Sequence, residues 1–425
     1  MHIAYVVHKF PPDSLGGVET YSWSLARVLA KLGHAVHVFY PRDGSSETAC
    51  PVELDGIRLW RAPIPLDRPG EGAVSQFWHT FRDSAVEASF QRFLRAAEPD
   101  VVHFQHVQGV SVRLIELVAN LPHLATLHDY WFLCPNSQLL RPDGQLCNGS
   151  RFGWDCVDCL TIRQELQWLR VLRPLVAVPL AYRNGYLRRV LESVPLLLAP
   201  SEFLRQKYLE HGFRAERLQK VDLGLDRERL NVGSGAQAAE SSDRPRSGPH
   251  FGFLGSLAPH KGLHVLVEAF NRLPDSACLT IYGNEHALPE YVSQLKARTV
   301  HPNVRFAGPV DHREVGSALR RLDCLVVPSI WYENSPMVIQ EAYGAGIPVV
   351  ASRLGALVEK VNDGETGLLF SPGNSMDLAC VLRELVDHPE RLDVLRANIR
   401  PPVTMQEHAR KMLAIYRAQL DRYSP

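Results

Sequence analysis

The stretch Asp323–Ser352, "DCLVVPSIWYENSPMVIQEAYGAGIPVVAS", decides the fold class. Its apolar runs at Asp323–Ser329 and Pro348–Ser352 are typical of strands buried on both faces. Between them, Ser335 as an N-cap and a proline at the first helical position predict a helix over Pro336–Ala345. A helix that joins two such strands predicts a parallel β-α-β unit.

The same alternation of strand and helix continues through the chain in two series. Further apolar strands are expected at His2–His8, Ala35–Pro41, Ile57–Ile64, Asp100–His106, Leu124–Trp131 and Leu196–Ser201, and then at His250–Leu257, Ala277–Gly283 and Asn303–Gly308. The pattern predicts an α/β protein with two doubly wound, Rossmann-like domains that face each other across a cleft. Ligands of such sheets bind beyond the carboxyl ends of the strands, so polar residues there are candidates for a site.

Composition suggests where the domains begin and end. We expect an N-terminal domain over residues 1–219, a C-terminal domain over 220–402, and a last helix over 403–425 that packs back on the N-terminal domain. The segment 231–249 is rich in Gly, Ser and Ala and poor in apolar residues, which predicts a flexible surface loop.

The charge balance excludes some partners. With 46 basic and 46 acidic residues among 425, the chain has no global field that would favour nucleic acid. No basic segment followed by an apolar run marks a signal peptide, and no apolar run reaches the roughly 18 residues of a spanning helix. We therefore expect a cytoplasmic protein, with peripheral contact at the inner face of the membrane as an open possibility.

Several polar residues follow the predicted strands. Gly16 and Gly17 precede a helix, where they either let backbone amides approach a ligand or simply form a tight turn. Lys261 also precedes a helix, as a phosphate ligand or as an exposed capping residue. His128 follows a strand, and a lone histidine is more often structural than catalytic. The glycine pattern of dinucleotide-binding proteins is missing, which argues against an oxidoreductase.

Glu333 and Glu341 flank the first turn of the helix in the opening stretch. The unpaired amides of a first turn form an anion site, so the two carboxylates would lie on either side of it. With 46 acidic residues in the chain, however, this spacing alone does not separate a site from chance.

Taken together, these segments resemble one protein family. The motifs that carry the resemblance are "GGVE" (Gly16–Glu19), "HDYW" (His128–Trp131), "APSEF" (Ala199–Phe203), "GSLAPHKG" (Gly255–Gly262), the stretch Val327–Ser352 and "NDGETGLLF" (Asn362–Phe370). In this order they are similar to retaining glycosyltransferases of family 4, from about Ile3 to Pro372. The resemblance implies a GT-B fold and a nucleoside diphosphate sugar as donor.

The resemblance also implies a role for each matching residue. The catalytic residues would be His128 near the transferred sugar, Lys261 at the departing diphosphate and Glu333 at the donor sugar. Glu341 would hold the ribose hydroxyls. The remaining donor-binding positions would be Gly16, Gly17, Ser256, Phe306, Asn334, Ser335, Met337 and Val338, with the nucleobase met through backbone atoms near Phe306.

The mechanism that the family implies is front-side attack, with the leaving phosphate helping to deprotonate the acceptor. It implies no catalytic metal, a UDP- or GDP-sugar as donor, and a sugar, a lipid-linked sugar or a small molecule as acceptor. Two alternatives remain open: a nucleotide-sugar epimerase of the same fold, and a non-catalytic scaffold. Ser256 stands where the family often has arginine, and Arg353 is one candidate to replace the missing charge.

Four cysteines cluster directly after the "HDYW" motif. Cys134, Cys147, Cys156 and Cys159 have the spacing C-x12-C-x8-C-x2-C within a cysteine-rich insertion, 134–159. Four thiolates satisfy tetrahedral zinc, and in a cytosolic chain a metal is more expected than disulfides. We therefore expect a structural zinc site beside the acceptor side of the cleft, with free or redox-active thiols as the alternative.

The segment 161–193 is basic and partly apolar. Its six arginines outnumber its two glutamates, and "PLVAVPLAY" (Pro174–Tyr182) is apolar. We favour a helix pair that covers the N-terminal sheet with its arginines directed outward. The alternative is contact with an anionic bilayer or a lipid-linked acceptor.

Overall fold

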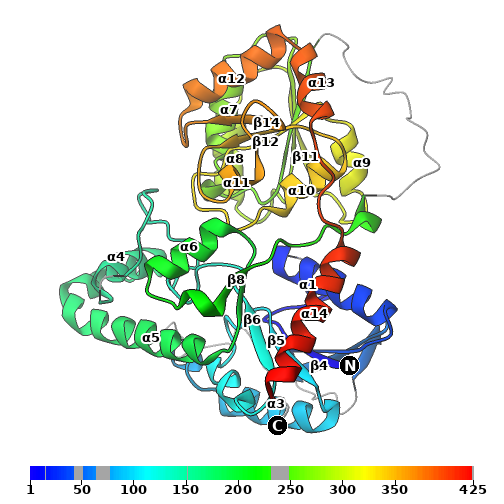
Figure 1. Ribbon diagram of the computed structural model, residues 1–425. Coiled ribbons are helices and arrows are strands. Elements are labelled where there is room, and N and C mark those ends of the chain that lie inside the picture. The colour runs from blue at the N-terminus through cyan, green and yellow to red at the C-terminus, as the bar shows by residue number, and fades with distance from the viewer. Residues whose placement is uncertain (15, 43–50, 64–76, 151, 231–247, 424–425) are drawn as a thin grey trace. The chain divides into compact units, whose positions relative to one another are not determined.

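The computed structural model describes residues 1–14, 16–42, 51–63, 77–150, 152–230 and 248–423. The chain divides into two compact units, residues 1–224 with 405–425 and residues 225–404 (Figure 1). The loop expected over 231–249 lies outside the described residues except for its last two positions.

The first unit is built on one sheet. Within the described residues its strands lie in the order β3-β4-β2-β1-β5-β6-β7-β8. They are β1 (His2–Val6), β2 (Ala35–Arg42), β3 (Val52–Leu54), β4 (Ile57–Pro63), β5 (Val101–Phe104), β6 (His123–Thr126), β7 (Leu197–Ala199) and β8 (Leu218–Lys220). All neighbours pair in parallel except β3 and β4, which are antiparallel. The order reverses between β1 and β5, so the carboxyl ends of these two strands mark the switch point at which such sheets bind ligands.

The helices of the first unit include the C-terminal one. They are α1 (Gly17–Lys31), α3 (Ser84–Ala97), α4 (Trp154–Arg163), α5 (Arg173–Ser193), α6 (Glu202–Glu210) and α14 (Met405–Tyr423). As expected, α14 returns to this unit and packs beside α1 (Figure 1).

Buried hydrogen bonds fix α14 in place. Tyr416 is fully buried, and its hydroxyl lies 3.1 Å from the Tyr5 hydroxyl and 2.8 Å from Nδ1 of His103. About two helical turns earlier, Nε2 of His408 lies 2.7 Å from the hydroxyl of Tyr21 on α1. Buried polar atoms need such partners, so these bonds specify how α14 sits on the sheet.

The second unit has a parallel sheet of its own, in the order β11-β10-β9-β12-β13-β14 for the described residues. Its strands are β9 (His250–Leu254), β10 (Cys278–Tyr282), β11 (Val304–Gly308), β12 (Cys324–Val327), β13 (Val349–Ser352) and β14 (Gly367–Phe370). Its helices are α7 (Leu263–Phe270), α8 (Pro289–Arg298), α9 (Val315–Arg320), α10 (Met337–Gly344), α11 (Leu357–Lys360), α12 (Ser375–Asp387) and α13 (Glu390–Ala397).

The apolar strands of this unit serve two cores. In β12, Cys324 and Val326 belong to the core that α7, α8, α12 and α13 cover, whereas Leu325 and Val327 belong to the core beneath α9, α10 and α11. Successive side chains of a strand point to opposite faces, so a strand covered on both faces must be apolar throughout. This explains why the sequence of β12 shows no polar alternation.

One expected strand is too long. We predicted a strand over Leu124–Trp131, but β6 ends at Thr126. The chain turns there because Asp129 Oδ1 accepts a hydrogen bond from the Trp131 amide at 2.8 Å, a local turn that competes with the strand. His128 and Asp129 therefore lie in the loop after the strand. Among the helices of the described residues, none is both long enough and apolar enough to cross a membrane.

We expect Tyr416→Phe to lower the free energy of unfolding of the first unit by about 1–3 kcal/mol, because it removes two buried hydrogen bonds. Tyr423→Phe on the same helix is the matched control. Its hydroxyl is partly exposed and 3.5 Å from His123, so its loss should change stability by less than about 0.5 kcal/mol. Urea denaturation followed by tyrosine and tryptophan fluorescence measures both, and equal effects would contradict the role given to Tyr416.

Candidate functional site

The order of the second sheet reverses between β9 and β12, and the candidate donor residues follow these two strands. Lys261 lies in a short 3-10 turn after β9, directly before α7. Glu333 lies in the loop between β12 and α10. Because the two strands are neighbours in the sheet, their carboxyl ends bring together residues that are 72 positions apart.

Gly262 allows the two loops to approach each other. Its φ is +71°, and a Cβ at this position would lie 1.8 Å from the carbonyl oxygen of Pro328. The neighbouring backbone is also joined across the loops, since the Ile330 amide donates to the His260 carbonyl at 2.9 Å. A glycine is therefore required next to Lys261 for both conformation and space.

Glu333 is buried and highly bonded. Its Oε1 accepts hydrogen bonds from Lys261 Nζ at 2.8 Å, from Ser329 Oγ at 2.6 Å and from Trp331 Nε1 at 3.0 Å. Burial disfavours the charged form, but Lys261 and the three hydrogen bonds outweigh it and hold the pKa of Glu333 below its ordinary value. Glu333 is therefore a carboxylate at neutral pH.

Lys261 remains accessible to a ligand. Its side chain is 25% exposed, against 6% for that of Glu333, and its ammonium lies 5.3 Å from the centre of the Trp331 ring. The Lys261 ammonium thus contacts a carboxylate and lies near an aromatic face, while part of the side chain is exposed to solvent. An anion that arrives from solvent would meet a cation already held in position.

The helix after Glu333 begins one residue later than predicted. Pro336 has an extended backbone (φ −66°, ψ 106°) and occupies the N-cap position, so α10 starts at Met337 and no side chain caps it. The prediction that Ser335 is the N-cap is therefore wrong. Within the described structure the buried Ser335 hydroxyl has no hydrogen-bond partner. The amides of Met337 and Val338 at the helix start need partners from outside the helix.

Glu341 lies one turn into α10, and Asn334 precedes the helix. Both are buried, with 6% and 9% of their surface exposed. Glu341 and Met337 are four residues apart, so they lie on the same side of the helix. The structure thus places both glutamates of the opening stretch in the interior of the same unit, near the start of one helix.

The other predicted donor residues lie further out. Ser256 is exposed just after β9. Arg353, the candidate to replace the arginine missing there, forms an ion pair with Asp363. Phe306 lies on β11, two strands from β9, with the ammonium of Lys296 5.3 Å from its ring centre.

In the first unit, the paired glycines begin α1. Gly16 is the N-cap residue, Gly17 is the first helical residue, and no side chain caps the helix. A Cβ on Gly16 would lie 2.4 Å from Glu19 Oε2, whereas a Cβ on Gly17 would have no described neighbour within 4 Å. The contact with Glu19 accounts for the glycine at position 16. The space beside Gly17 is open to a ligand or to solvent.

His128 is held in a neutral form. Its Nε2 lies 2.9 Å from Gln105 Oε1 and its ring centre 5.2 Å from that of Tyr21. Burial and the neighbouring His106 lower the pKa of His128 to about 3. Since Gln105 Oε1 can only accept, Nε2 carries the proton and Nδ1 is the acceptor. At neutral pH His128 can orient a hydroxyl but cannot donate a proton as an imidazolium.

Two partners of this loop, Gln105 and His106, were not predicted from the sequence; both follow β5. His106 Nε2 lies 2.9 Å from Asp129 Oδ2. Although burial opposes it, His106 and the Trp131 amide keep the pKa of Asp129 below its ordinary value. The "FQH" sequence at the end of a predicted strand was the available signal, since β5 and β6 are neighbours.

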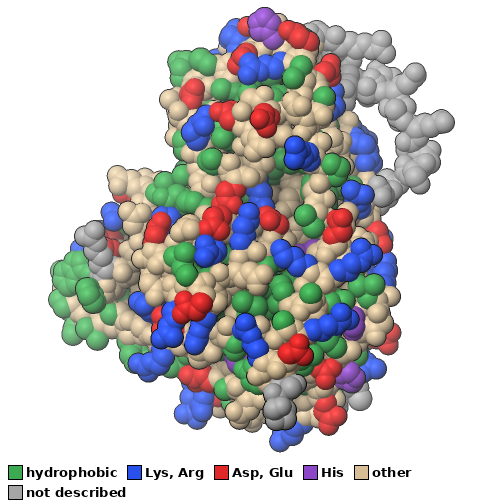
Figure 2. Space-filling view, viewed as in Figure 1, with side chains coloured by type: hydrophobic (Ala, Val, Ile, Leu, Met, Phe, Trp, Pro, Cys, Tyr) green, Lys and Arg blue, Asp and Glu red, His purple; other side chains and the backbone are tan. Residues whose placement is uncertain are grey.

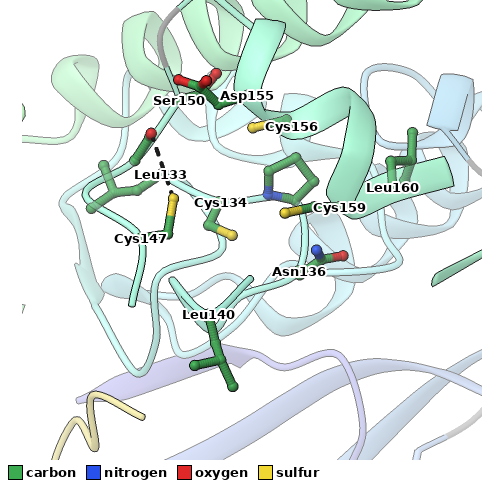
Figure 3. Close-up of a pocket in the computed structure, with 12 residues that line it drawn as sticks. Leu133, Cys134, Asn136, Leu140, Cys147, Ser150, Asp155, Cys156, Cys159 and Leu160 are labelled. Carbon is green, nitrogen blue, oxygen red and sulfur yellow. Dashed lines mark hydrogen bonds between the residues drawn. The ribbon is translucent and has the colours of Figure 1, made fainter. Parts of the chain in front are cut away.

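The four clustered cysteines line one pocket of the first unit (Figure 3). Burial and the neighbouring sulfurs raise the pKa of Cys156 to about 12 and that of Cys159 to about 11. All four are free cysteines. Among the described residues, no three His, Cys, Asp or Glu side chains are already close enough together to hold a metal ion.

One family model matches each unit of the chain. The model described as "Glycosyltransferase Family 4" matches residues 15–229, and "Glycosyl transferases group 1" matches residues 237–401. These ranges include Gly16, Gly17 and His128 in the first unit and Lys261, Glu333 and Glu341 in the second.

Individual relatives cover different shares of the chain. A phosphatidyl-myo-inositol mannosyltransferase of Mycobacterium leprae is 28% identical over 90% of this chain and 86% of its own. A glycogen synthase of Mycobacterium tuberculosis is 36% identical over 150 residues, which is 34% of this chain and 36% of that enzyme. The chain therefore matches only about a third of the length of this enzyme.

Solved structures show the fold. Sucrose-phosphate synthase from Thermosynechococcus elongatus superimposes with a TM-score of 0.71 at 19% identity, over 99% of both chains. Anabaena HepE, solved in complex with UDP and glucose, gives 0.65 at 18% identity, over 98% of this chain and 99% of that one. The two-domain α/β architecture is that of the GT-B fold.

We expect Gly262→Ala to destabilise the second unit by more than about 2 kcal/mol, because the Cβ would overlap the Pro328 carbonyl oxygen. Gly373→Ala is the matched control: its φ is +73° but its Cβ would meet nothing within 4 Å, so it should cost only about 1–2 kcal/mol of backbone strain. Urea denaturation of the two variants measures the difference. Equal losses would show that Gly262 is needed for its conformation alone.

Proposed function

The chain belongs to glycosyltransferase family 4, and we propose that it transfers a sugar, with retention of anomeric configuration, from a nucleoside diphosphate sugar to a hydroxyl group. The observation that carries this proposal is the Lys261–Glu333 pair at the switch point of the second sheet, in the loops next to an uncapped helix start. A cation, unpaired amides and an oriented carboxylate are the groups that a sugar diphosphate requires.

Lys261 and the α10 amides would stabilise the leaving group. When the anomeric bond breaks, negative charge develops on the β-phosphate, and fixed positive groups lower its energy without reorganising. Lys261 is held 2.8 Å from Glu333 and is partly exposed, so it can share its ammonium protons with a phosphate. The amides of Met337 and Val338 would add the positive end of the helix dipole.

These groups would supply the positive charge that a divalent metal supplies in other enzymes. We therefore expect sugar transfer to proceed in the presence of EDTA.

Glu333 would keep its position while Lys261 turns to the phosphate. Ser329 and Trp331 still donate to Oε1, so the carboxylate does not depend on the lysine alone. All three donors meet at Oε1, and Oε2 is the oxygen that would accept a hydroxyl of the donor sugar. Glu341 would accept from the ribose diol, and the buried Ser335 hydroxyl would find its partner on the ligand.

The first unit would contribute neutral groups. The Gly17 amide would approach a phosphate oxygen through the open space at its Cα, and neutral His128 would orient a hydroxyl of the transferred sugar or of the acceptor. Neither group competes for the proton of the attacking hydroxyl, which fits front-side attack with the leaving phosphate as the base. For the donor base, UDP or GDP is favoured, and the likeness to HepE in complex with UDP supports the first.

We expect slow release of nucleotide from one sugar in a panel of UDP-, GDP-, ADP- and dTDP-sugars. Lys261→Ala and Glu341→Ala should each reduce it at least about 100-fold, because each removes a group that binds the departing nucleotide. Lys411→Ala, an exposed lysine of α14, is the control that should leave the rate unchanged. NMR of the glycosylated product gives its anomeric configuration. Isomerised nucleotide sugar without transfer would favour an epimerase, and no binding of any donor would favour a scaffold.

A lipid-linked acceptor is supported by an exposed apolar face on α5. Leu175, Val178 and Tyr182 follow each other at helical spacing and are 70%, 68% and 57% exposed. Trp168 and Val171, just before the helix, are 64% and 85% exposed. The opposite face of α5 is buried, as the helix-pair interpretation expected, but Arg183 belongs to that buried face, so the expectation that the arginines are directed outward is wrong for this one. Figure 2 shows hydrophobic side chains gathered over α4 and the start of α5, at the left of the view.

The surroundings of this face favour an anionic bilayer. The segment 161–193 carries six arginines against two glutamates. Large exposed apolar patches mark interaction sites, and basic residues around them attract anionic lipids. We therefore propose that this face contacts the membrane in which the acceptor lies. The Mycobacterium leprae relative is named phosphatidyl-myo-inositol mannosyltransferase, and phosphatidyl-myo-inositol is a lipid, which agrees with a lipid acceptor.

We expect the protein to float with phosphatidylglycerol vesicles and not with phosphatidylcholine vesicles. Leu175→Ser combined with Val178→Ser should weaken the binding about tenfold or more, because two aliphatic side chains no longer enter the bilayer. Val300→Ser with Val394→Ser, at 74% and 58% exposure in the second unit, is the matched control. Equal flotation of wild type and double variant would remove the α5 face as a membrane contact.

A further inference from the structure

We propose that Cys134, Cys147, Cys156 and Cys159 hold one zinc ion, which fastens α4 to the loop that carries the His128–Trp131 motif. The four sulfurs border one pocket in the first unit (Figure 3). This metal site is independent of the proposed transfer reaction, since none of the four cysteines is among the residues given to the donor.

Three local structures deliver the four side chains. Cys156 and Cys159 are three residues apart on α4 and so lie on one face of that helix. Cys134 ends a tight turn, with its amide donating to the Tyr130 carbonyl at 2.7 Å. Cys147 closes a small hairpin, in which its amide donates to the Leu139 carbonyl at 2.8 Å. Two ligands from a helix and two from turns is an arrangement that suits a structural zinc site.

The interior of the pocket suits a single ion. Leu133, Leu140 and Leu160 also line it, and Cys134 and Cys156 are no more than 9% exposed. The cavity of about 10 Å³ has room for one ion or one water and not for an iron–sulfur cluster. Cys147 now directs its thiol to the Gly149 carbonyl at 3.7 Å, a weak contact. Because no three of the described thiols are already close enough together to hold an ion, Cys147 and at least one other of the four side chains would turn toward the pocket to form a tetrahedral set of sulfurs.

A buried arginine of α5 is electrostatically coupled to two of these cysteines. Arg183 of α5 is only 3% exposed, and its hydrogen bonds go to neutral acceptors, the Trp131 carbonyl at 2.9 Å and the Asn184 side chain at 3.1 Å. The negative groups that act on it are Cys134 and Cys156 as thiolates, followed by the Asp129 carboxylate. Four thiolates around one Zn²⁺ carry a net charge of about −2, so a zinc centre would add to the counter-charge that Asp129 provides for this buried guanidinium.

The zinc ion would position part of the first unit. Arg183 joins the pocket to the Trp131 carbonyl, and the Trp131 amide is bonded to Asp129, whose carbonyl accepts from Tyr208 at 2.9 Å. The metal would thus hold the loop that carries His128 from behind without touching substrate. Its role is structural.

The test is the metal content of the full-length protein, purified without a histidine tag and without chelators. Plasma mass spectrometry should find about one zinc per chain, and Cys156→Ser should reduce it at least about tenfold. Cys278→Ser and Cys380→Ser, cysteines outside the cluster, are the controls and should keep the metal. Loss of zinc should lower Tm by about 5 °C or more.

Cobalt exchange tests the ligands in the unaltered protein, in case the Cys156 variant does not fold. Replacement of zinc by Co²⁺ should produce the visible absorption of tetrahedral thiolate coordination. Well under one zinc per chain, iron in its place, or four native thiols that all react with Ellman's reagent would overturn the proposal. None of these results would affect the nucleotide-release assay, so failure of the metal site and failure of the transferase can be distinguished.

Discussion

The second unit depends on one charge pair, the partly exposed Lys261 with the buried Glu333. A buried carboxylate is stable only when it is paired and bonded, and Glu333 meets this requirement with a lysine, a serine and an indole. The pair requires the loops after β9 and β12 to approach closely, which in turn requires a glycine at 262. The same approach places a cation near the uncapped start of α10. The geometry that resolves the burial of Glu333 would therefore also build the proposed anion site.

Much of the fold follows from periodicity, and the exceptions have physical reasons. Strands buried on both faces are apolar throughout, which is why β9, β10 and β12 are visible in the sequence. By contrast, β3 and β8 are three residues long and carry exposed side chains, so they have no pattern to detect. The start of α10 depends on one dihedral angle of Pro336, which composition does not determine. The pattern of apolar residues predicts only the two series of strands. The resemblance to family 4 is what assigns motifs from both units to one site.

The candidate site was predictable as a set of residues but not as a set of contacts. Lys261, Glu333 and Glu341 can be chosen from the motifs, yet no spacing reveals that Lys261 and Glu333 bond across 72 positions. Likewise, His106 with Asp129 and Gln105 with His128 are each 23 positions apart. These contacts arise because neighbouring strands end together, and strand order is a property of the whole sheet. The neutral state of His128 comes from burial, which a motif does not contain.

The two units treat buried charge differently, and this difference supports a division of labour. The second unit pairs its buried carboxylate with a lysine and keeps the charges that a phosphate would meet. The first unit keeps His8, His103 and His128 neutral by burial, which suits groups that orient hydroxyls without taking protons. Arg183 departs from this rule, because it is a buried cation whose hydrogen bonds go to neutral acceptors. Asp129 acts on it as a carboxylate, and a zinc ion that converts the four neighbouring thiols to thiolates would add to that negative charge.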